Sequence, residues 1–316
     1  MTPDPTRQPL PSPATPPPRR RNPLLAAIAP WVAAVLLITS TCLHVPVLLA
    51  VALFKAVLRI PAWRRTFDAW LMAIAENWIG INSAMIDRFT STRFVIEGLE
   101  GLRPDGHYLV LANHRSWVDI PVLQKAFNRR IPLLRFFLKS QLFWVPLLGL
   151  AWWALDFPFM RRYTKSQIAK NPALAGRDVE ATRRACAKFL TIPVSVMNFV
   201  EGTRFTGAKH AAQQPPYRHL LRPKAGGVAF VLGAMGQAID AVLDVTIHYD
   251  TGTPSFADLF ADRIGVVRVH VRELPVPEGF AGGDYENDRA FRVRFQAWLN
   301  GLWQEKDARL ESWKGE

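Results

Sequence analysis

Residues 23–54 contain no formally charged side chain, and this run restricts how the N-terminal part of the chain can fold. A membrane-spanning helix needs about 20 apolar residues, so the run is long enough for one span or for a re-entrant hairpin that breaks at Pro30 and Pro46. It exceeds the roughly 7–15 residues of a signal-peptide core, which favours a retained membrane anchor over residues 23–60. Basic residues flank both ends of the anchor. Because cytoplasmic segments carry the excess of Lys and Arg, this symmetry favours the hairpin, with both flanks in the cytoplasm.

The composition is typical of a protein that works at a membrane. Hydrophobic residues make up 49% of the 316 residues, with 11 Trp, and the net charge is +13. Basic charge also suits nucleic-acid binding, but the chain has no zinc-finger spacing, basic zipper or RNP-type aromatic signature. We therefore predict the membrane, and no nucleic acid, as a partner. Cys42 and Cys186 form no disulfide framework, which fits a body that faces the reducing cytosol at the cytoplasmic or inner membrane.

Two further segments flank the anchor. Residues 1–22 contain eight prolines and few apolar residues, which predicts a disordered tail that ends in an Arg cluster. After the anchor, residues 61–92 carry apolar side chains at helical spacing, namely Trp70, Leu71, Ile74, Trp78 and Ile81. We predict an amphipathic connecting helix that lies either on the membrane surface or against the protein core.

The remaining residues, 93–316, are enough for one α/β domain and alternate strand-like and helix-like patterns. Apolar, β-branched runs predict strands at 93–97, 107–112, 193–200, 241–249 and 266–272. The last of these alternates apolar and basic residues, as in a half-exposed edge strand. Apolar residues at helical spacing over 291–303 predict a C-terminal amphipathic helix. The predicted fold is an α/β domain with a mixed sheet flanked by helices, behind an N-terminal membrane anchor.

A His–Asp motif follows the second predicted strand: His114 is followed by Asp119 five residues later. On a regular helix these side chains would lie on different faces, but a strand-to-helix turn can fold Asp119 back onto the imidazole. The carboxylate would then hold one ring nitrogen and leave the other free to accept a proton. The alternative is a structural His that caps the helix starting near Ser116. Ser116 itself is expected to be a helix N-cap rather than a nucleophile.

A second motif, Glu201-Gly202-Thr203-Arg204, follows the third predicted strand. Glycine permits an unusual backbone angle and close approach of a ligand, Thr203 offers a hydroxyl, and Arg204 offers a planar set of donors for a phosphate. The alternative is a surface turn with a solvated Arg. Sites in open α/β sheets lie at the carboxyl ends of strands, so both motifs are expected at one edge. Together they indicate chemistry on a phosphorylated alcohol.

These residues resemble the signatures of the lysophospholipid acyltransferases, which include the 1-acyl-glycerol-3-phosphate acyltransferases. Asn113, His114 and Asp119 match the Asn-His-x4-Asp signature, and residues 201–204 match Glu-Gly-Thr/Ser-Arg in full. The intervening family segment is matched by Lys139, Pro146, Gly149 and Arg161 or Arg162. Residues 242–247 lack the Pro of the fourth motif, which resembles the lysocardiolipin acyltransferase branch and its bacterial relatives. The resemblance covers roughly residues 70–275 and implies a glycerolipid-acyltransferase-like fold.

The resemblance implies transfer of a fatty acyl group from a thioester to the free hydroxyl of a lysophospholipid. His114 would be the general base and Asp119 would orient it. Arg204 would bind the acceptor phosphate, with Glu201 shaping that pocket by pairing with a basic neighbour. Lys139, Arg161 and Arg162 would be further substrate contacts, although Lys139 reads equally well as a surface lysine and the two arginines as charges at the end of an interfacial helix.

Several alternatives remain open at this stage. The leading acceptor is 1-acyl-sn-glycerol-3-phosphate, and lysocardiolipin or lysophosphatidylglycerol are alternatives. A phospholipase-type hydrolase and a non-catalytic lipid-binding module are the other classes. We expect no cofactor, with acyl-CoA or acyl-carrier protein as co-substrate. No metal is expected, because His107 and His114 lack partners at metal-binding spacing.

Two segments carry no assigned role. The apolar residues 142–153 suit a membrane-facing wall, an acyl-chain channel or buried core. The basic loop that contains Lys209 and Lys224 suits lipid headgroups, donor phosphates or simple solvation.

Overall fold

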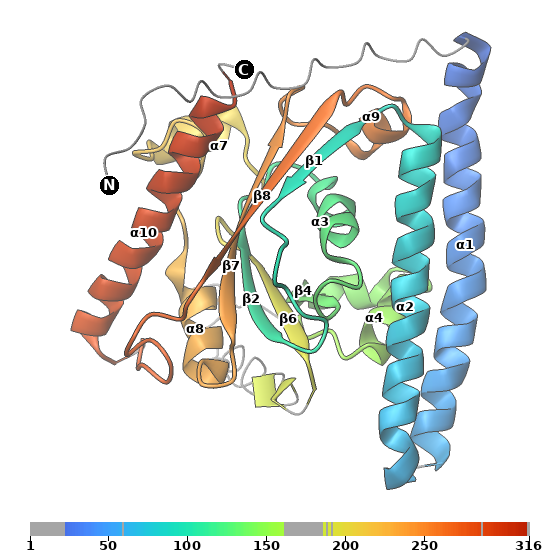
Figure 1. The fold of residues 1–316 in the computed structure, drawn as a ribbon, viewed down its shortest axis with the longest axis horizontal. Helices are drawn as coiled ribbons and strands as arrows, with labels where there is room; N and C mark the ends of the chain where they lie inside the picture. The colour runs from blue at the N-terminus through green and yellow to red at the C-terminus, as the bar shows by residue number, and fades with distance from the viewer. Residues whose placement is uncertain are drawn as a thin grey trace, which may run out of the picture.

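A computed structural model describes residues 23–58, 60–160, 186–187, 189–190, 192–285 and 287–314. Its centre is a mixed six-stranded sheet in the order β1-β8-β7-β2-β6-β3, with helices on both faces (Figure 1). This confirms the predicted fold class.

The strands of this sheet are β1 (Arg93–Glu97), β2 (His107–Ala112), β3 (Leu134–Phe136), β6 (Val194–Phe199), β7 (Ala241–Tyr249) and β8 (Val266–Leu274). A separate two-stranded sheet pairs β4 (Leu138–Lys139) with β5 (Phe159–Met160). The helices are α1 (Pro23–Leu58), α2 (Pro61–Phe89), α3 (Asp119–Phe127), α4 (Leu148–Ala154), α7 (Gly207–Gln213), α8 (Ala225–Met235), α9 (Phe256–Phe260) and α10 (Arg289–Ser312), with a 3-10 helix, η1 (Ser140–Trp144).

The register of the sheet brings three strand ends together. Strands β6, β2 and β7 are parallel, and Ala112 lies opposite both Phe199 and Val245. The segments after β2, β6 and β7 therefore leave the sheet at the same edge, where sites of α/β folds form.

All five predicted strands are present, with two differences. Strand β3 was not predicted, because it has only three residues and a charged one, Arg135, in the middle, and the two-residue strands β4 and β5 were not predicted either. The prediction that 266–272 forms an edge strand is wrong: β8 lies between β1 and β7, and β1 is the edge. The alternation in β8 comes from one buried and one partly exposed face, which an inner strand can also have.

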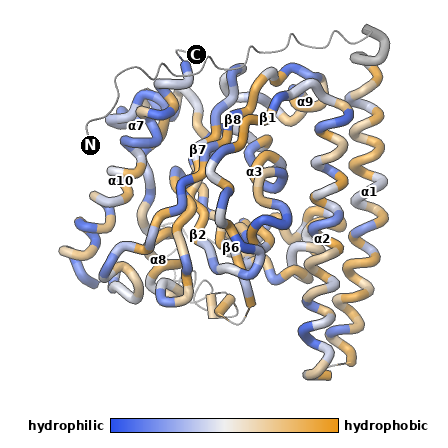
Figure 2. Tube along the Cα trace, viewed as in Figure 1, coloured by the Kyte–Doolittle hydropathy of each residue, from blue (hydrophilic) through white to orange (hydrophobic). Residues whose placement is uncertain are grey.

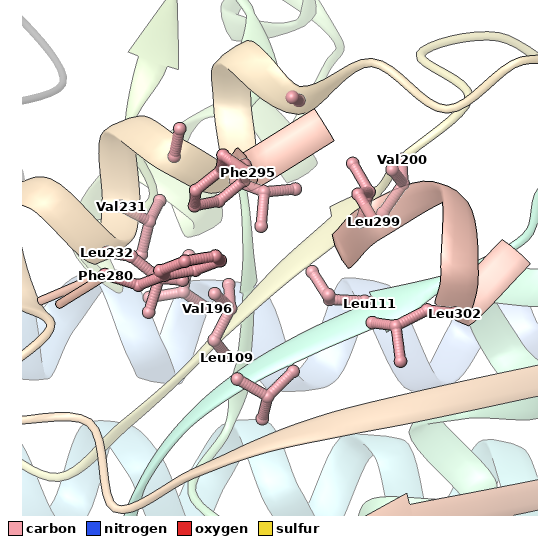
Figure 3. Close-up of a cluster of buried hydrophobic side chains, with 14 of the residues drawn as sticks. Leu109, Leu111, Val196, Val200, Val231, Leu232, Phe280, Phe295, Leu299 and Leu302 are labelled. Carbon is pink, nitrogen blue, oxygen red and sulfur yellow. The ribbon is translucent and has the colours of Figure 1, made fainter. Parts of the chain in front are cut away.

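Each face of the sheet has its own hydrophobic core. Because side chains alternate along a strand, Leu109 and Leu111 of β2 point toward α8 and α10, whereas Val110 points toward α3. Figure 3 shows the first cluster, in which Phe295 and Leu299 of α10 approach the side chains of the sheet. Strand β2 is buried on both faces, which explains its continuous apolar sequence.

A buried ionic cluster ties the predicted C-terminal helix, α10, to the sheet. Lys306 is fully buried, and its Nζ lies 2.7 Å from Asp244 Oδ1 and donates to the carbonyl oxygen of Val245 at 2.6 Å. Burial lowers the pKa of Lys306, and Asp244 opposes that shift. Arg272 of β8 donates to the other Asp244 oxygen at 2.7 Å, so the carboxylate has two cationic partners.

The predicted breaks at Pro30 and Pro46 are wrong, because α1 is a continuous helix through both residues. The chain instead reverses between Leu58 and Pro61, and α2 runs back beside α1 (Figure 1). Packing against α2 outweighs the local cost of each proline. Helix α1 is apolar along most of its length (Figure 2), and Ile28–Leu58 is long and apolar enough to cross a membrane. Its use as an anchor stays a prediction.

Polar contacts join α1 to α2 at three levels. Trp78 Nε1 donates to Thr41 Oγ1 at 3.3 Å, and Asn77 Nδ2 lies 3.1 Å from His44 Nε2. Lys55 forms an ion pair with Asp68. The buried face of α2 differs from the predicted one: Leu71 is buried, whereas Trp70 and Ile81 are exposed, and Phe67, Ala75, Ile79 and Ile86 complete the buried face.

Candidate active site

His114 and Asp119 lie in contact at the carboxyl edge of β2. The strand ends at Ala112 and α3 begins at Asp119, so the short connection folds the carboxylate back onto the ring. His114 Nδ1 is 2.7 Å from Asp119 Oδ2. The other ring nitrogen, Nε2, has no hydrogen bond to the described part of the chain. This is the arrangement that a carboxylate-oriented general base requires.

Asp119 is completely buried and receives hydrogen bonds on both oxygens. The backbone N–H groups of Arg115 and Ser116 donate to Oδ2 at 2.7 and 3.0 Å. The hydroxyl of Tyr249, at the end of β7, donates to Oδ1 at 2.6 Å. Burial raises the pKa of Tyr249 well above its usual value, with the negative charge of Asp119 adding to the shift, so the hydroxyl remains a donor. These hydrogen bonds fix the orientation of the Asp119 carboxylate.

The residues beside the pair lock the connection in place. The Asn113 amide is buried; its Nδ2 donates to Ile247 O and its Oδ1 accepts from Ile247 N, each at 2.9 Å. The prediction that Ser116 is the N-cap of the helix is wrong, since Val118 occupies that position. Ser116 Oγ instead accepts from the Val118 N–H at 3.0 Å and donates to Pro254 O.

The His114 ring stacks on Phe199, the last residue of β6. The ring centroids are 3.9 Å apart and the planes differ by 12°. Phe136 of β3 continues the row, with its ring centroid 6.0 Å from that of Phe199. An aromatic face against the imidazole restricts rotation of the ring.

The Glu-Gly-Thr-Arg turn packs directly against the His114 segment. Gly202 has φ +68°, in the left-handed region that favours glycine. A Cβ there would lie 3.2 Å from the Lys224 side chain, a tight contact that the flexible lysine could relieve by a small shift, so the backbone angle is the stronger reason for glycine. The Phe205 N–H donates to the His114 carbonyl oxygen at 2.7 Å, which fixes one motif to the other.

Cationic groups gather around this turn. The exposed Arg204 guanidinium lies 4.7 Å above the Trp117 ring. Lys209 Nζ donates to Thr203 Oγ1 at 2.7 Å and to Arg204 O at 2.9 Å, and Lys224 lies over Gly202. Within the described ranges, none of these three cations forms an ion pair. The edge next to His114 is therefore suited to a phosphate.

Glu201 lies beneath this surface. It is buried, and burial raises its pKa to about 8, with the positive charge of Arg115 and a backbone hydrogen bond from Leu221 opposing the shift. The Arg115 guanidinium lies 4.6 Å from the centroid of the Phe205 ring, and among the described residues it forms no ion pair. That Glu201 shapes the phosphate pocket remains a prediction. Its buried side chain would act from beneath the pocket.

The remaining candidates lie elsewhere. Lys139 is exposed in β4, on the separate two-stranded sheet, and no hydrogen bond links it to the residues of the site that the structure describes. Arg161 and Arg162 lie outside the described residues.

The structure adds residues that the sequence alone did not single out, above all Tyr249 and Phe199. Each lies at the carboxyl end of a predicted strand at the site edge, which is the signal that could have identified them. Among the described residues, no three His, Cys, Asp or Glu side chains lie close enough to hold a metal ion.

Comparison with known proteins gives a consistent picture. Residues 93–249 match the model of the Acyltransferase family. The chain is 27% identical over 249 residues to probable 1-acyl-sn-glycerol-3-phosphate acyltransferase 5 of Arabidopsis thaliana, covering 74% of this chain and 60% of the relative. It is 25% identical over 260 residues to lysocardiolipin acyltransferase 1 of Danio rerio, covering 75% and 60%. The chain thus spans about 60% of the length of these relatives.

Among solved structures, the 1-acyl-sn-glycerophosphate (LPA) acyltransferase of Thermotoga maritima matches with a TM-score of 0.42 and 19% identity, over 84% of this chain and 98% of that one. The family match contains the His114–Asp119 pair, the Glu-Gly-Thr-Arg turn and Tyr249. Residues 93–249 form a domain of the acyltransferase family.

Proposed function

We propose that this protein is a membrane-associated O-acyltransferase that moves a fatty acyl group from a thioester to the free hydroxyl of a lysophospholipid. The observation that carries the proposal is the His114–Asp119 pair at 2.7 Å, fixed to a cationic turn that contains Arg204. A base and a phosphate-binding group at one edge are what acylation of a phosphorylated alcohol needs.

In the reaction, the acceptor hydroxyl oxygen attacks the thioester carbonyl while His114 Nε2 takes the hydroxyl proton. Asp119 stabilises the imidazolium through Nδ1, and the Phe199 ring restricts its rotation. The tetrahedral intermediate then expels the thiolate by cleavage of the C–S bond. The imidazolium returns its proton to the sulfur, which leaves an ester, a free thiol and neutral His114.

The acceptor is proposed to be 1-acyl-sn-glycerol-3-phosphate, giving phosphatidic acid. The support is the cationic turn next to His114, together with the activities named for the relatives. Lysocardiolipin and lysophosphatidylglycerol are the alternatives, since a relative carries the name lysocardiolipin acyltransferase. Acyl-CoA or acyl-carrier protein is the proposed donor, and no cofactor enters this chemistry.

The anchor is proposed to lie along the membrane surface rather than across it. Helix α1 is bonded to α2 at three levels, from Thr41 to Lys55. Helix α2 carries the charged residues Arg64, Arg65, Asp68 and Glu76, and charged side chains are costly in the hydrocarbon core. Because the two helices stay together, α1 would bury only its outer face in lipid. The start of α1 and the end of α2 then lie on the same side of the membrane. We propose that this is the cytosolic side of the inner membrane.

Replacing Arg204 by Lys tests the acceptor site. A lysine keeps the charge but loses both the planar fork and the stack on Trp117, so we expect KM for lysophosphatidate to rise about tenfold. The KM for the acyl donor should stay unchanged. The measurement is steady-state acyl transfer by the purified full chain with lysophosphatidate, lysophosphatidylglycerol and lysocardiolipin.

Arg103→Lys is the matched control, because Arg103 is an exposed arginine at the opposite edge of the sheet, near Asp240. An unchanged KM for every acceptor in Arg204→Lys would remove Arg204 from the phosphate site. Release of free fatty acid without acceptor-dependent ester would instead favour the hydrolase, and no turnover of any donor would favour the non-catalytic lipid-binding module.

A further inference from the structure

The segment between β4 and β5 exposes large apolar side chains. Residues 142–155 contain no charged side chain, and the only side-chain hydrogen-bonding groups among them are indole N–H groups. Trp144 is 81% exposed, Trp153 59%, Leu150 44% and Leu147 37%. We call these four residues the α4 patch. Clustered apolar exposure of this kind marks an interaction surface rather than scattered surface residues.

The backbone that presents the α4 patch is strained. Leu147 has φ +62° and ψ −53°, a region that non-glycine residues rarely adopt. Gly149 lies so close to the preceding turn that a Cβ would come within 1.9 Å of the Phe143 carbonyl oxygen. A strained turn of this kind costs about 1–3 kcal/mol and persists when function requires the geometry. Leu147, in this turn, is 37% exposed.

The opposite side of α4 is apolar as well, and it packs on the anchor. Ala151 and Leu155 form a buried cluster with Val45 and Leu48 of α1 and with Leu71 of α2. Helix α4 is therefore hydrophobic all round, although among the described residues only one side is covered by protein. Such helices are found in protein cores or in lipid.

The α4 patch extends a larger apolar surface. The outer face of α1 exposes many large apolar residues, including Trp31, Val35, Leu53 and Val57. Because α4 packs directly on α1, the α4 patch lies on a helix that is in contact with the helix that carries this exposed apolar surface. Tryptophan is favoured at the membrane interface, where its ring meets both apolar and polar surroundings.

We propose that the α4 patch is a second membrane contact, which inserts into the lipid surface beside α1 and fixes the orientation of the α/β domain. The proposal rests on the proposed function in taking α1 to lie in lipid. The site is linked to this side of the domain by a row of aromatic rings. His114 stacks on Phe199, Phe199 lies next to Phe136, and Phe136 packs against the buried cluster beneath α4. Docking there would bring His114 toward lipid-borne substrates.

The test places an environment-sensitive fluorophore at single cysteines of the full chain, in a Cys42→Ser background that removes the exposed native thiol. Labels go at Trp144→Cys and Leu150→Cys in the α4 patch. Leu53→Cys on α1 reports membrane association itself. Val293→Cys is the matched control, an apolar residue 63% exposed on α10. Each protein is added to phosphatidylglycerol–phosphatidylethanolamine vesicles, with and without brominated acyl chains.

We expect a blue shift and quenching by brominated lipid at positions 144, 150 and 53, and neither at 293. A response at 53 without one at 144 and 150 would overturn the α4 patch as a membrane contact while leaving membrane association intact. No response at 53 would overturn membrane association and the inference together. A shift at 144 that depends on protein concentration without vesicles would assign the patch to a second copy of the chain instead.

Discussion

Replacing Asp119 by Asn is expected to slow acyl transfer by about 10³-fold, because the amide no longer stabilises the imidazolium form of His114. The carboxylate is buried and accepts from His114, Arg115, Ser116 and Tyr249. An amide has one acceptor oxygen and one donor group, so it cannot satisfy all four. The measurement is kcat of the purified variant at saturating donor and acceptor, with the melting temperature recorded to show that the variant is folded.

Tyr249→Phe is also expected to slow acyl transfer, but less than Asp119→Asn does. It removes one donor to the ionised carboxylate, and a hydrogen bond to a charged group is worth about 1.5–3 kcal/mol, so kcat should fall by about tenfold or more. Tyr108→Phe is the matched control, since this buried tyrosine hydroxyl on β2 accepts from the Arg103 N–H, away from the site. Equal rates for Tyr249→Phe and Tyr108→Phe would show that Tyr249 does not act through Asp119.

Replacing Lys306 by Met is expected to destabilise the fold by about 3 kcal/mol, because it leaves Asp244 Oδ1 and the Val245 carbonyl oxygen buried without their donor. Methionine keeps most of the side-chain volume, so the effect reports the charge rather than a cavity. Arg272 still compensates part of the Asp244 charge, which limits the loss. The expected decrease in melting temperature is about 5–10 °C.

Arg294→Ala serves as the control for Lys306→Met, since it removes an exposed cation from the same helix. Its effect should stay within about 0.5 kcal/mol. A Lys306→Met protein that melts at the native temperature would contradict the structural role of the cluster.

Local patterns predicted the main strands because those strands are buried on both faces and therefore read as continuous apolar runs. The same reasoning missed β3, whose three residues include the charged Arg135. It also placed a break at Pro30 and Pro46, because the local cost of proline is visible in the sequence whereas the compensating contacts with α2 are not. Strand order depends on pairing between distant segments, so the inner position of β8 could not be read from its alternation.

The two motifs were expected at one edge because parallel strands end together, and the structure places them there. The partner of Asp119 was beyond sequence reasoning: Tyr249 is 130 residues away, and the contact depends on the register of β2 against β7. The stack of Phe199 on His114 likewise needs β2 and β6 to be aligned residue by residue. Burial of Glu201 depends on the elements that close over the turn, which no local pattern specifies.

The proposed reaction depends on His114 acting as the general base. The measurement is ester formation from labelled acyl-CoA, and from acyl-carrier-protein thioester, with lysophosphatidate as acceptor, by the purified full chain and by His114→Ala. We predict acceptor-dependent ester from the native chain and a loss of about 10³-fold or more in the variant, which lacks the base. A folded His114→Ala protein that forms ester at the native rate would contradict the mechanism.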